Sequence, residues 1–281
     1  MTISVLMSVY KAENPEFLER AISSVMDEQT LSPNELVLVE DGDLPEELRA
    51  IIERWQNQLG SKMTILRNQE NIGLTKSLNH GIKVIKSDLI ARMDTDDISC
   101  PQRFEKQVAF FKEHQEVDIL GGAIIEIDGE EHVINKRYYP ADQKAVLKSI
   151  FRANPIAHSS VMIRKRIFDE GLRYNEKYRT NQDLALWFDA ICEGYKIANL
   201  QEVVLHFRRL SNVYYRRRRK KNLWNEFCIY CNGIRRIYGM FSFKYIYPFM
   251  RLILKLMPTF IVKWAYQSNI RRIVTEREVN R

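Results

Sequence analysis

The chain has 281 residues, of which 45% are hydrophobic and 28% charged, a composition typical of a soluble protein. Four cysteines in a chain of this length exclude a disulfide framework, and the length suits one domain with an extension or two small domains. The formal charge of +7 is unevenly distributed along the chain. Residues 200–281 carry 18 Lys and Arg against 4 Asp and Glu, whereas the first 199 residues carry 25 against 32. The basic part therefore predicts a polyanionic surface as a partner.

The start of the chain predicts a cytoplasmic setting. Met1-Thr2 leads directly into a strand-like run, without the regions of a signal peptide. Cys228 and Cys231 form a single CxxC, but there is no second pair and no nearby histidine, so a zinc site is not expected. Free thiols fit a reducing compartment.

The first hundred residues alternate between strand-like and helical patterns. Apolar runs predict strands at residues 3–9, 35–39, 63–66 and 89–91, and helical spacing of apolar residues predicts helices at 16–28, 46–59 and 74–85. These repeats predict an α/β fold with a mostly parallel sheet and helices on both faces. The first, second and fourth strands end in polar loops, which such a sheet brings to one edge, where ligands bind.

The fourth of these strands is followed by three acids within four residues, Asp94, Asp96 and Asp97. Crowded carboxylates repel one another unless a positive charge neutralises them, and a hard divalent cation does so while keeping sites open for substrate phosphates. The alternative is a solvated acidic turn that caps the next helix, beginning at Pro101. For the three acids alone this alternative is the simpler interpretation; the rest of the chain favours the cation.

The middle of the chain completes the globular part. A β-hairpin is predicted around Asp128-Gly129, from strands at 117–127 and 132–139. Helices are predicted at 101–114, 141–151 and 183–193, with a short helix from 165 and strands at 160–163 and 203–207. Trp187 is expected in the core, because large aromatic side chains contribute most when buried.

The remaining residues predict a basic and aromatic helical extension. Residues 216–221 are six consecutive basic residues, and residues 240–266 are apolar but interrupted by Lys244, Arg251, Lys255 and Lys263. On a helix the first three of these lie within about 40° of one another and form a basic stripe. Pro248 and Pro258 would divide the segment into short helices.

A basic stripe opposed to aromatic and aliphatic bulk is typical of a helix that lies in the plane of an anionic membrane. No run reaches the roughly 20 uncharged apolar residues that a spanning helix needs. Two alternatives stay open. One is a helical cap that turns its basic face to water, and the other is a tail that binds nucleic acid.

Five stretches of the chain, taken in order, resemble the family-2 glycosyltransferases with a GT-A fold. They are SVLMSVYKAEN from Ser4, ELVLVEDGD from Glu35, NIGLTKSLNHGI from Asn71, DLIARMDTDDIS from Asp88 and NQDLALW from Asn181. The resemblance is closest to enzymes that build bacterial surface polysaccharides such as O-antigen and exopolysaccharide. It covers residues 1–210, the expected catalytic domain, and leaves residues 211–281 as a membrane-associating extension.

The resemblance implies a donor site at the predicted sheet edge. Ser8, Val9, Tyr10 and Asp41 would hold the nucleotide base, with Asp41 accepting from the uracil N–H. Asp94 and Asp96 match the family's DxD motif and are assigned to a divalent metal, Mn²⁺ or Mg²⁺, on the donor diphosphate. Asp94 would also lie near the ribose, and Asp97 would assist either.

Further donor contacts are expected from Asn71, Lys76 and Asn79, which lie in the run beside the donor pocket. Arg208 follows a strand where the family has a mobile loop over the donor phosphates, and it would bind the diphosphate bidentately. Arg209 is an alternative to it, and both could instead begin the basic surface. His158 resembles a position near the family's acceptor site, although a buried, hydrogen-bonded histidine is an equal alternative.

Asp183 matches the catalytic base of the family. The family commonly has Glu-Asp at this point, whereas this chain has Gln182-Asp183. The substitution removes one negative charge beside the base, which affects acceptor specificity more than catalysis.

The predicted function is that of an inverting, metal-dependent glycosyltransferase. It would move a sugar from a nucleotide-diphosphate donor, a UDP-sugar, to a polyprenyl-diphosphate-linked oligosaccharide at the cytoplasmic face of the inner membrane, with peripheral attachment and no nucleic acid as partner. A nucleotidyltransferase is the enzymatic alternative. Such an enzyme would require a glycine-rich, basic loop after the first strand, where this chain has Tyr10-Lys11-Ala12-Glu13. The donor sugar, the acceptor and the linkage depend on pocket shape and a few hydrogen bonds.

Overall fold

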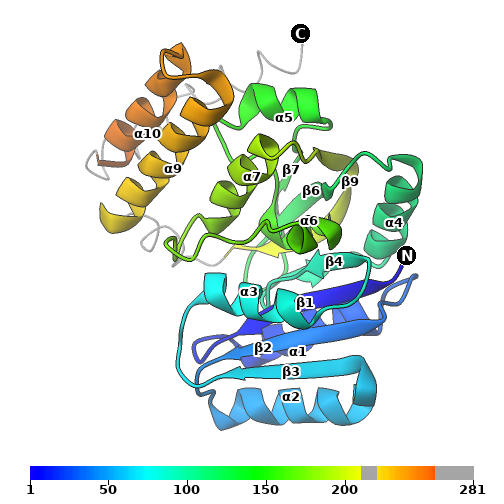
Figure 1. The fold of residues 1–281 in the computed structure, drawn as a ribbon. Coiled ribbons are helices and arrows are strands. Elements are labelled where there is room, and N and C mark those ends of the chain that lie inside the picture. Colours follow the sequence, from blue (N-terminus) through cyan, green and yellow to red (C-terminus); the bar gives the residue numbers. More distant parts are fainter. Residues whose placement is uncertain (210–219, 257–281) are drawn as a thin grey trace. The chain divides into compact units, whose positions relative to one another are not determined.

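The structure is a computed structural model, and it describes residues 1–209 and 220–256 (Figure 1). The chain divides into two compact units, Met1–Ser211 and Asn212–Arg281. The first contains the sheet and the helices that flank it, and the described part of the second contains the helices α9 (Lys220–Tyr238) and α10 (Ile246–Leu256).

The beginning of the first unit forms four parallel strands joined by helices, as the sequence predicted. β1 (Ile3–Val9) lies between β2 (Glu35–Asp41) and β4 (Leu89–Arg92), and β3 (Met63–Asn68) pairs with β2. The connections are α1 (Pro15–Met26), α2 (Glu46–Leu59), the 3-10 turn η1 (Gly60–Lys62) and α3 (Leu74–Val84).

The second half of this unit continues the same sheet, which within the described residues has the order β3-β2-β1-β4-β8-β6-β9-β5. β8 (Met162–Arg164) pairs antiparallel with β4 and β6 (Ile119–Ile127), and β9 (Ile197–Arg208) runs parallel to β6. β7 (Val133–Arg137) forms the predicted hairpin with β6. The remaining elements are α4 (Arg103–Glu113), α5 (Gln143–Ser149), η2 (His158–Ser160), α6 (Arg166–Asp169) and α7 (Gln182–Cys192).

Two strands differ from the sequence prediction. β9 begins at Ile197 rather than at residue 203. The sequence pattern does not predict its first half, because residues 199–202 are Asn-Leu-Gln-Glu and the β6–β9 register shifts near Ala123, which breaks the alternation of apolar and polar side chains. β5 (Ile98–Ser99) was not predicted; it is two residues long and exists through antiparallel pairing with β9. In both cases a distant partner, and not the local pattern, defines the strand.

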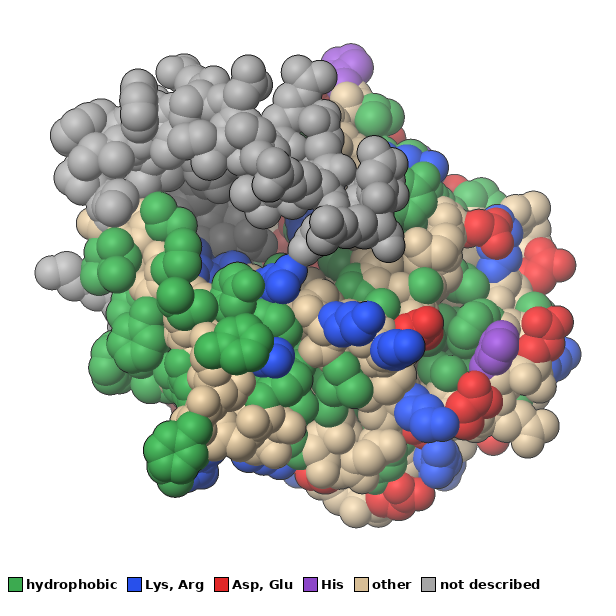
Figure 2. Space-filling view, turned by 90° about the horizontal axis from the view of Figure 1, so that it is seen from above, with side chains coloured by type: hydrophobic (Ala, Val, Ile, Leu, Met, Phe, Trp, Pro, Cys, Tyr) green, Lys and Arg blue, Asp and Glu red, His purple; other side chains and the backbone are tan. Residues whose placement is uncertain are grey.

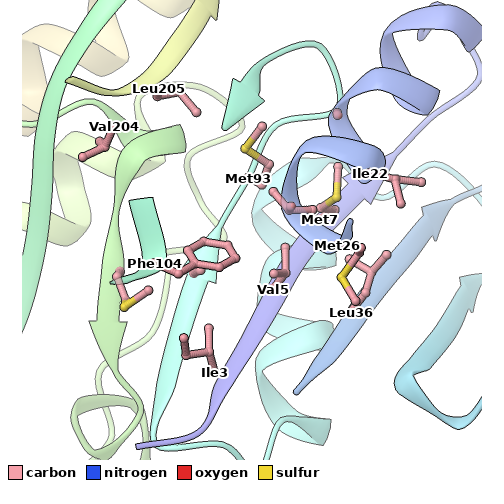
Figure 3. Close-up of a cluster of buried hydrophobic side chains, with 14 of the residues drawn as sticks. Ile3, Val5, Met7, Ile22, Met26, Leu36, Met93, Phe104, Val204 and Leu205 are labelled. Atoms are coloured by element: carbon pink, nitrogen blue, oxygen red, sulfur yellow. The ribbon is translucent and has the colours of Figure 1, made fainter. Parts of the chain in front are cut away.

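The sheet is covered on both faces by apolar side chains. On one face Ile3, Val5 and Met7 of β1 join a buried cluster with residues of α1 and α4 (Figure 3). On the other face α3 approaches β1 closely, since a Cβ atom at Gly81 would lie 2.3 Å from Cδ1 of Leu6. This packing fixes the strands, and with them the loops at their carboxyl ends.

Three of these loops meet at one edge of the sheet. β2 and β4 pair in parallel with opposite sides of β1, and the three strands end at Val9 (β1), Asp41 (β2) and Arg92 (β4). The edge where parallel strands end is the usual ligand-binding edge of an open α/β sheet.

The second unit consists, in its described part, of α9 (Lys220–Tyr238), the 3-10 turn η3 (Phe243–Tyr245) and α10 (Ile246–Leu256). The rings of Phe227 and Phe249 pack edge to face across the two helices, with centroids 4.9 Å apart. Pro248 was predicted to break the helix, but it lies in the first turn of α10, where the missing N–H has no intrahelical acceptor. Residues 216–219, Pro258 and Lys263 lie outside the described residues.

The predicted basic stripe is not an isolated face turned to water. Arg251 and Lys255 both form ion pairs with the buried carboxylate of Glu226 on α9, and Lys244 lies over the rings of Tyr238 and Phe243. The exposed side chains of α10 are apolar, and Figure 2 shows hydrophobic side chains gathered over this unit, at the left of the view. The exposed apolar residues of α10 are Ile246, Phe249, Met250, Ile253, Leu254 and Leu256. No helix in the described ranges is long and apolar enough to cross a membrane.

Candidate active site

The acidic loop after β4 gathers three carboxylates. Asp94, Asp96 and Asp97 each offer an oxygen, and these oxygens lie within 4.8 Å of one another. Burial, followed by the neighbouring charge of Asp94, raises the pKa of Asp96 to about 6. Burial and the charges of Asp96 and Asp94 raise the pKa of Asp97 well above its ordinary value. Raised pKa values mean that full ionisation of the three carboxylates is unfavourable. A divalent cation bound by their oxygens would compensate the negative charge.

Asp97 is the innermost of the three acids. Its side chain is fully buried, and its Oδ1 accepts the backbone N–H of Arg208 across 2.8 Å. No described residue completes a hydrogen bond to its buried Oδ2, although the nearby Ser159 hydroxyl partly offsets the rise in its pKa. A buried carboxylate oxygen without a hydrogen bond is costly, so Oδ2 of Asp97 would suit a cation held by this loop.

Asp94 faces a buried arginine. Arg92 donates from Nη1 to Oδ2 of Asp94 across 2.6 Å, and from Nη2 to Oδ1 of the same carboxylate. No local motif assigns a role to Arg92. The only sequence signal was its position as a lone cation in the strand that leads into the acids.

Asp183, the predicted base, lies in the first turn of α7. Its Oδ2 accepts a hydrogen bond from Nδ2 of Asn154 across 2.5 Å. Burial raises the pKa of Asp183, while hydrogen bonds from Leu184 and Asn154 and the charge of Arg92 partly offset the rise. A carboxylate with a raised pKa is a better proton acceptor near neutral pH.

Asn154 lies 29 residues before Asp183 and belongs to none of the five family-like stretches, so only the tertiary structure brings the two together. The segment before α7 is itself tied to α3. Thr75 Oγ1 donates to the carbonyl of Tyr178 across 2.6 Å, and Asn79 exchanges two hydrogen bonds with the backbone of Tyr174. The base therefore comes from a segment that is anchored beside the predicted donor loop.

Asp41 holds the turn that begins α3. Its carboxylate is 4% exposed and accepts the N–H groups of Ile72 and Gly73, each across 2.9 Å, and Nδ2 of Asn68 across 3.1 Å. A Cβ atom at Gly42 would lie 2.7 Å from the nitrogen of Asn71, so this close approach needs glycine. The contact of Asp41 with a uracil N–H stays a prediction. The Asp41 carboxylate already accepts three hydrogen bonds, from Asn68, Ile72 and Gly73.

The other predicted donor residues surround this turn. Ser8 and Tyr10 are half-buried at the end of β1, whereas the Val9 side chain is fully buried, so only its backbone can face a ligand. Asn71 is exposed and donates to the Asp41 carbonyl across 3.2 Å, and Lys76 is exposed in the first turn of α3. The structure thus places these residues at one edge; their contacts with a donor stay predictions.

Arg208 is engaged by the protein itself. Its side chain is 1% exposed, and its guanidinium donates to the carbonyl of Asp96, to the turn between β6 and β7, and to the carboxylate of Glu131. Arg209 forms an ion pair with Glu126 and is one-third exposed. Binding of a diphosphate by Arg208 stays a prediction; its contacts in the structure stabilise the acidic loop against the turn between β6 and β7.

His158 and Trp187 lie together behind the site. Trp187 is fully buried, as predicted. The His158 ring lies 6.0 Å from it, centroid to centroid, and its Nε2 is 2.8 Å from the hydroxyl of Tyr174. Burial, and then the charge of Arg92, lower the pKa of His158 well below its usual value, so its ring is neutral. The His158 side chain is half-buried and hydrogen-bonded, and a role near the acceptor stays a prediction.

Comparison with known proteins gives a consistent result. The model of "Glycosyl transferase family 2" matches residues 4–172. The amylovoran biosynthesis glycosyltransferase AmsE of Erwinia amylovora is 33% identical over 95% of this chain and 98% of its own length. An Escherichia coli UDP-Gal:alpha-D-GlcNAc-diphosphoundecaprenol beta-1,3-galactosyltransferase is 28% identical over 96% of this chain and 97% of its own.

Solved structures agree on the fold. The crystal structure of S. aureus TarS in complex with UDP superposes with a TM-score of 0.61, covering 91% of this chain and 81% of that one at 17% sequence identity. The complex of the same protein with UDP-GlcNAc also gives a TM-score of 0.61, at 16% identity. The predicted fold, a GT-A sheet flanked by helices, is confirmed for the first unit.

Proposed function

The chain belongs to glycosyltransferase family 2, and from this premise we propose that it is an inverting, metal-dependent enzyme that transfers a sugar from a UDP-sugar to a lipid-linked oligosaccharide in surface-polysaccharide synthesis. The observation that carries the proposal is the acidic loop after β4, in which Asp94, Asp96 and Asp97 bring carboxylate oxygens within 4.8 Å of one another. The family assignment decides against the nucleotidyltransferase alternative.

The donor is proposed from chemistry and from relatives. Asp94 and Asp96 lie at the end of β4, and a divalent cation bound there would offset the negative charge that develops on the leaving diphosphate. Ser8, Tyr10 and Asp41, at the ends of β1 and β2, are proposed to receive the nucleotide base. A uracil nucleotide is supported by the UDP-Gal in the name of the E. coli relative and by the UDP in the TarS complex.

Asp183 is proposed as the general base. It takes the proton of the acceptor hydroxyl while that oxygen forms a bond to the anomeric carbon and the bond from this carbon to the diphosphate breaks. A single displacement of this kind inverts the anomeric configuration. The hydrogen bond from Asn154 would keep one oxygen of Asp183 occupied, so that the other oxygen faces the acceptor.

The acceptor is proposed to be linked to a polyprenyl diphosphate at the cytoplasmic face of the inner membrane. The diphosphoundecaprenol in the name of the E. coli relative supports this class of acceptor. The second unit supports attachment to the membrane surface, because residues 212–281 carry 16 Lys and Arg against 3 Glu, and α10 exposes apolar side chains. In-plane insertion of apolar side chains beside basic ones is typical of peripheral membrane binding.

The proposal is tested by screening nucleotide sugars for binding and slow hydrolysis with Mn²⁺ or Mg²⁺. A UDP-sugar is expected to bind and to be hydrolysed, and a chelator is expected to abolish hydrolysis. A protein that binds no nucleotide sugar with either cation would contradict the proposal. With a synthetic polyprenyl-diphosphate acceptor, the anomeric configuration of the product, followed by nuclear magnetic resonance, tests inversion.

A further inference from the structure

The mechanism proposed above gives no role to Arg92, the last residue of β4. Its side chain is 3% exposed, and its guanidinium forms a two-pronged ion pair with Asp94. A buried arginine is costly unless its charge is compensated in good geometry, and a planar guanidinium facing both oxygens of a carboxylate provides that geometry. Arg92 therefore places a permanent positive charge directly beside the acidic loop.

The charge of Arg92 lies within the cluster of acids. Its partner Asp94 belongs to the group of three carboxylates whose oxygens lie within 4.8 Å of one another, so the same guanidinium is close to Asp96 and Asp97. One buried cation thus stands among the proposed metal ligands.

Arg92 also makes the two acids of the DxD motif unequal. Both oxygens of Asp94 face its guanidinium, whereas Asp96 has no ion pair among the described residues. A carboxylate whose charge is already compensated attracts a cation weakly, but its orientation is fixed. The Asp96 carboxylate therefore attracts a cation more strongly than Asp94 does, whereas the orientation of the Asp94 carboxylate is fixed by its ion pair.

We propose that Arg92 is a positioning residue that holds the Asp94 carboxylate toward the nucleotide sugar and restrains cation binding until the donor diphosphate is present. This rests on the proposed function, in which the acidic loop receives a cation together with that diphosphate. With the resident charge in place, the loop alone binds a divalent cation weakly. The diphosphate then adds both negative charge and oxygen ligands, so cation and donor bind as a pair.

The test separates this role from a purely structural one. Arg92→Met removes the charge and keeps an unbranched side chain, and calorimetry gives the affinity for Mn²⁺ alone and for UDP in saturating Mn²⁺. We expect Mn²⁺ alone to bind roughly threefold tighter or more, since the loop gains net negative charge. We expect UDP to bind roughly tenfold more weakly, since Asp94 loses its fixed orientation. Loss of structure would weaken both affinities, so opposite changes are the signature of the proposed role.

Arg103→Met is the matched control. Arg103 is another fully buried arginine, and its guanidinium donates to the main-chain carbonyls of Arg92 and Val161 and, among the described residues, to no carboxylate. We expect this variant to lose stability without opposite changes in the two affinities. If Arg92→Met does not fold, Arg92→Lys carries the test, because it keeps the charge but not the two-pronged pair. Arg92→Lys should weaken the binding of UDP and leave the affinity for Mn²⁺ in the absence of UDP unchanged.

The outcomes are distinguishable. Unchanged affinities in Arg92→Met, or a loss of both, would overturn the role of Arg92, as would unchanged UDP affinity in Arg92→Lys if only that variant folds. A wild-type protein that binds neither Mn²⁺ nor UDP would instead overturn the proposed function, and the role of Arg92 with it.

Discussion

Arg208 donates its backbone N–H to Oδ1 of Asp97 across 2.8 Å, although 111 residues separate the two in the chain. Its Nε donates to the carbonyl of Asp96 across 2.9 Å, and its guanidinium lies 4.1 Å from the centre of the Phe17 ring. The end of β9 therefore fixes the position of the acidic loop that follows β4. This relationship leads to the first of five predictions.

Arg208→Met should lower the free energy of unfolding by about 3 kcal/mol, because a buried guanidinium with several hydrogen bonds is lost. Urea unfolding measures the change. Arg209→Met is the control, and it should cost less than about 1 kcal/mol, since the Arg209 side chain is 33% exposed and its ion pair is partly screened. If Arg208→Met instead kept its stability and lost UDP affinity, Arg208 would be the donor ligand that the sequence suggested.

Asp183→Asn should keep UDP binding and reduce the turnover number by roughly 10²–10⁴-fold, the usual contribution of a general base. Steady-state transfer assays and calorimetry with UDP measure the two effects. Asp189→Asn provides a matched acid on another face of α7, six residues and about 240° away around the helix, and should be nearly unaffected in turnover. Unchanged turnover in Asp183→Asn would remove this residue as the base.

Asp96→Asn should weaken Mn²⁺ binding in the presence of UDP by roughly tenfold or more, because an anionic oxygen ligand becomes neutral. Electron paramagnetic resonance of free Mn²⁺ measures the affinity. Asp43→Asn makes the same charge change near the end of β2, at a carboxylate that is 98% exposed, and should have little effect. Equal losses in the two variants would indicate a general electrostatic effect and no metal ligand at Asp96.

Replacing Phe249 and Ile253 of α10 by Ser should weaken binding to vesicles of equal parts phosphatidylglycerol and phosphatidylcholine by roughly tenfold or more. Both side chains are about half exposed and lie one turn apart, and burial in the lipid interface stabilises apolar area. Cosedimentation measures the binding. Val133→Ser, at an exposed apolar residue of β7, is the control. Unchanged vesicle binding, with tight binding to an oligonucleotide, would favour the nucleic-acid alternative.

Glu226→Gln should reduce the stability of α9 and α10 at pH 7, and by less at pH 3. Burial raises the pKa of Glu226, but Arg251 and Lys255 more than reverse this, so its pKa in the folded state is lowered. A lowered pKa adds stability above the unfolded value, near 4.3, and this stability is lost as the pH falls through the folded value.

Hydrogen exchange of amides in α9 and α10, corrected for intrinsic rates, measures this effect. The wild type should be more stable than Glu226→Gln by about 1–2 kcal/mol at pH 7. A difference of the same size at both pH values would show that the contribution of Glu226 does not depend on its charge.

Much of the fold follows from local patterns in the sequence. The strands β1 to β4 and helices α1 to α3 have apolar periods that match their structure, and Asp94 and Asp96 follow a buried strand as expected. The strand β5 and the first half of β9 have no such pattern. β5 exists through pairing with Leu205 and His206 near the end of β9, and the first half of β9 exists through pairing with β6. The same holds for the direction of α10, whose basic residues turn toward Glu226 only because α9 supplies that carboxylate.

The order of β1 to β4 with their helices, the carboxylates that follow β4 and the family resemblance can be read from local patterns, since strand length, helix spacing and motif order are properties of neighbouring residues. The partner that each charged group takes depends on how distant segments pack together. Arg208 braces the acidic loop, Arg92 compensates Asp94, and Asn154 orients Asp183. The physical reason is that a buried charge must find a partner wherever the chain brings one within reach, and that partner can lie a hundred residues away.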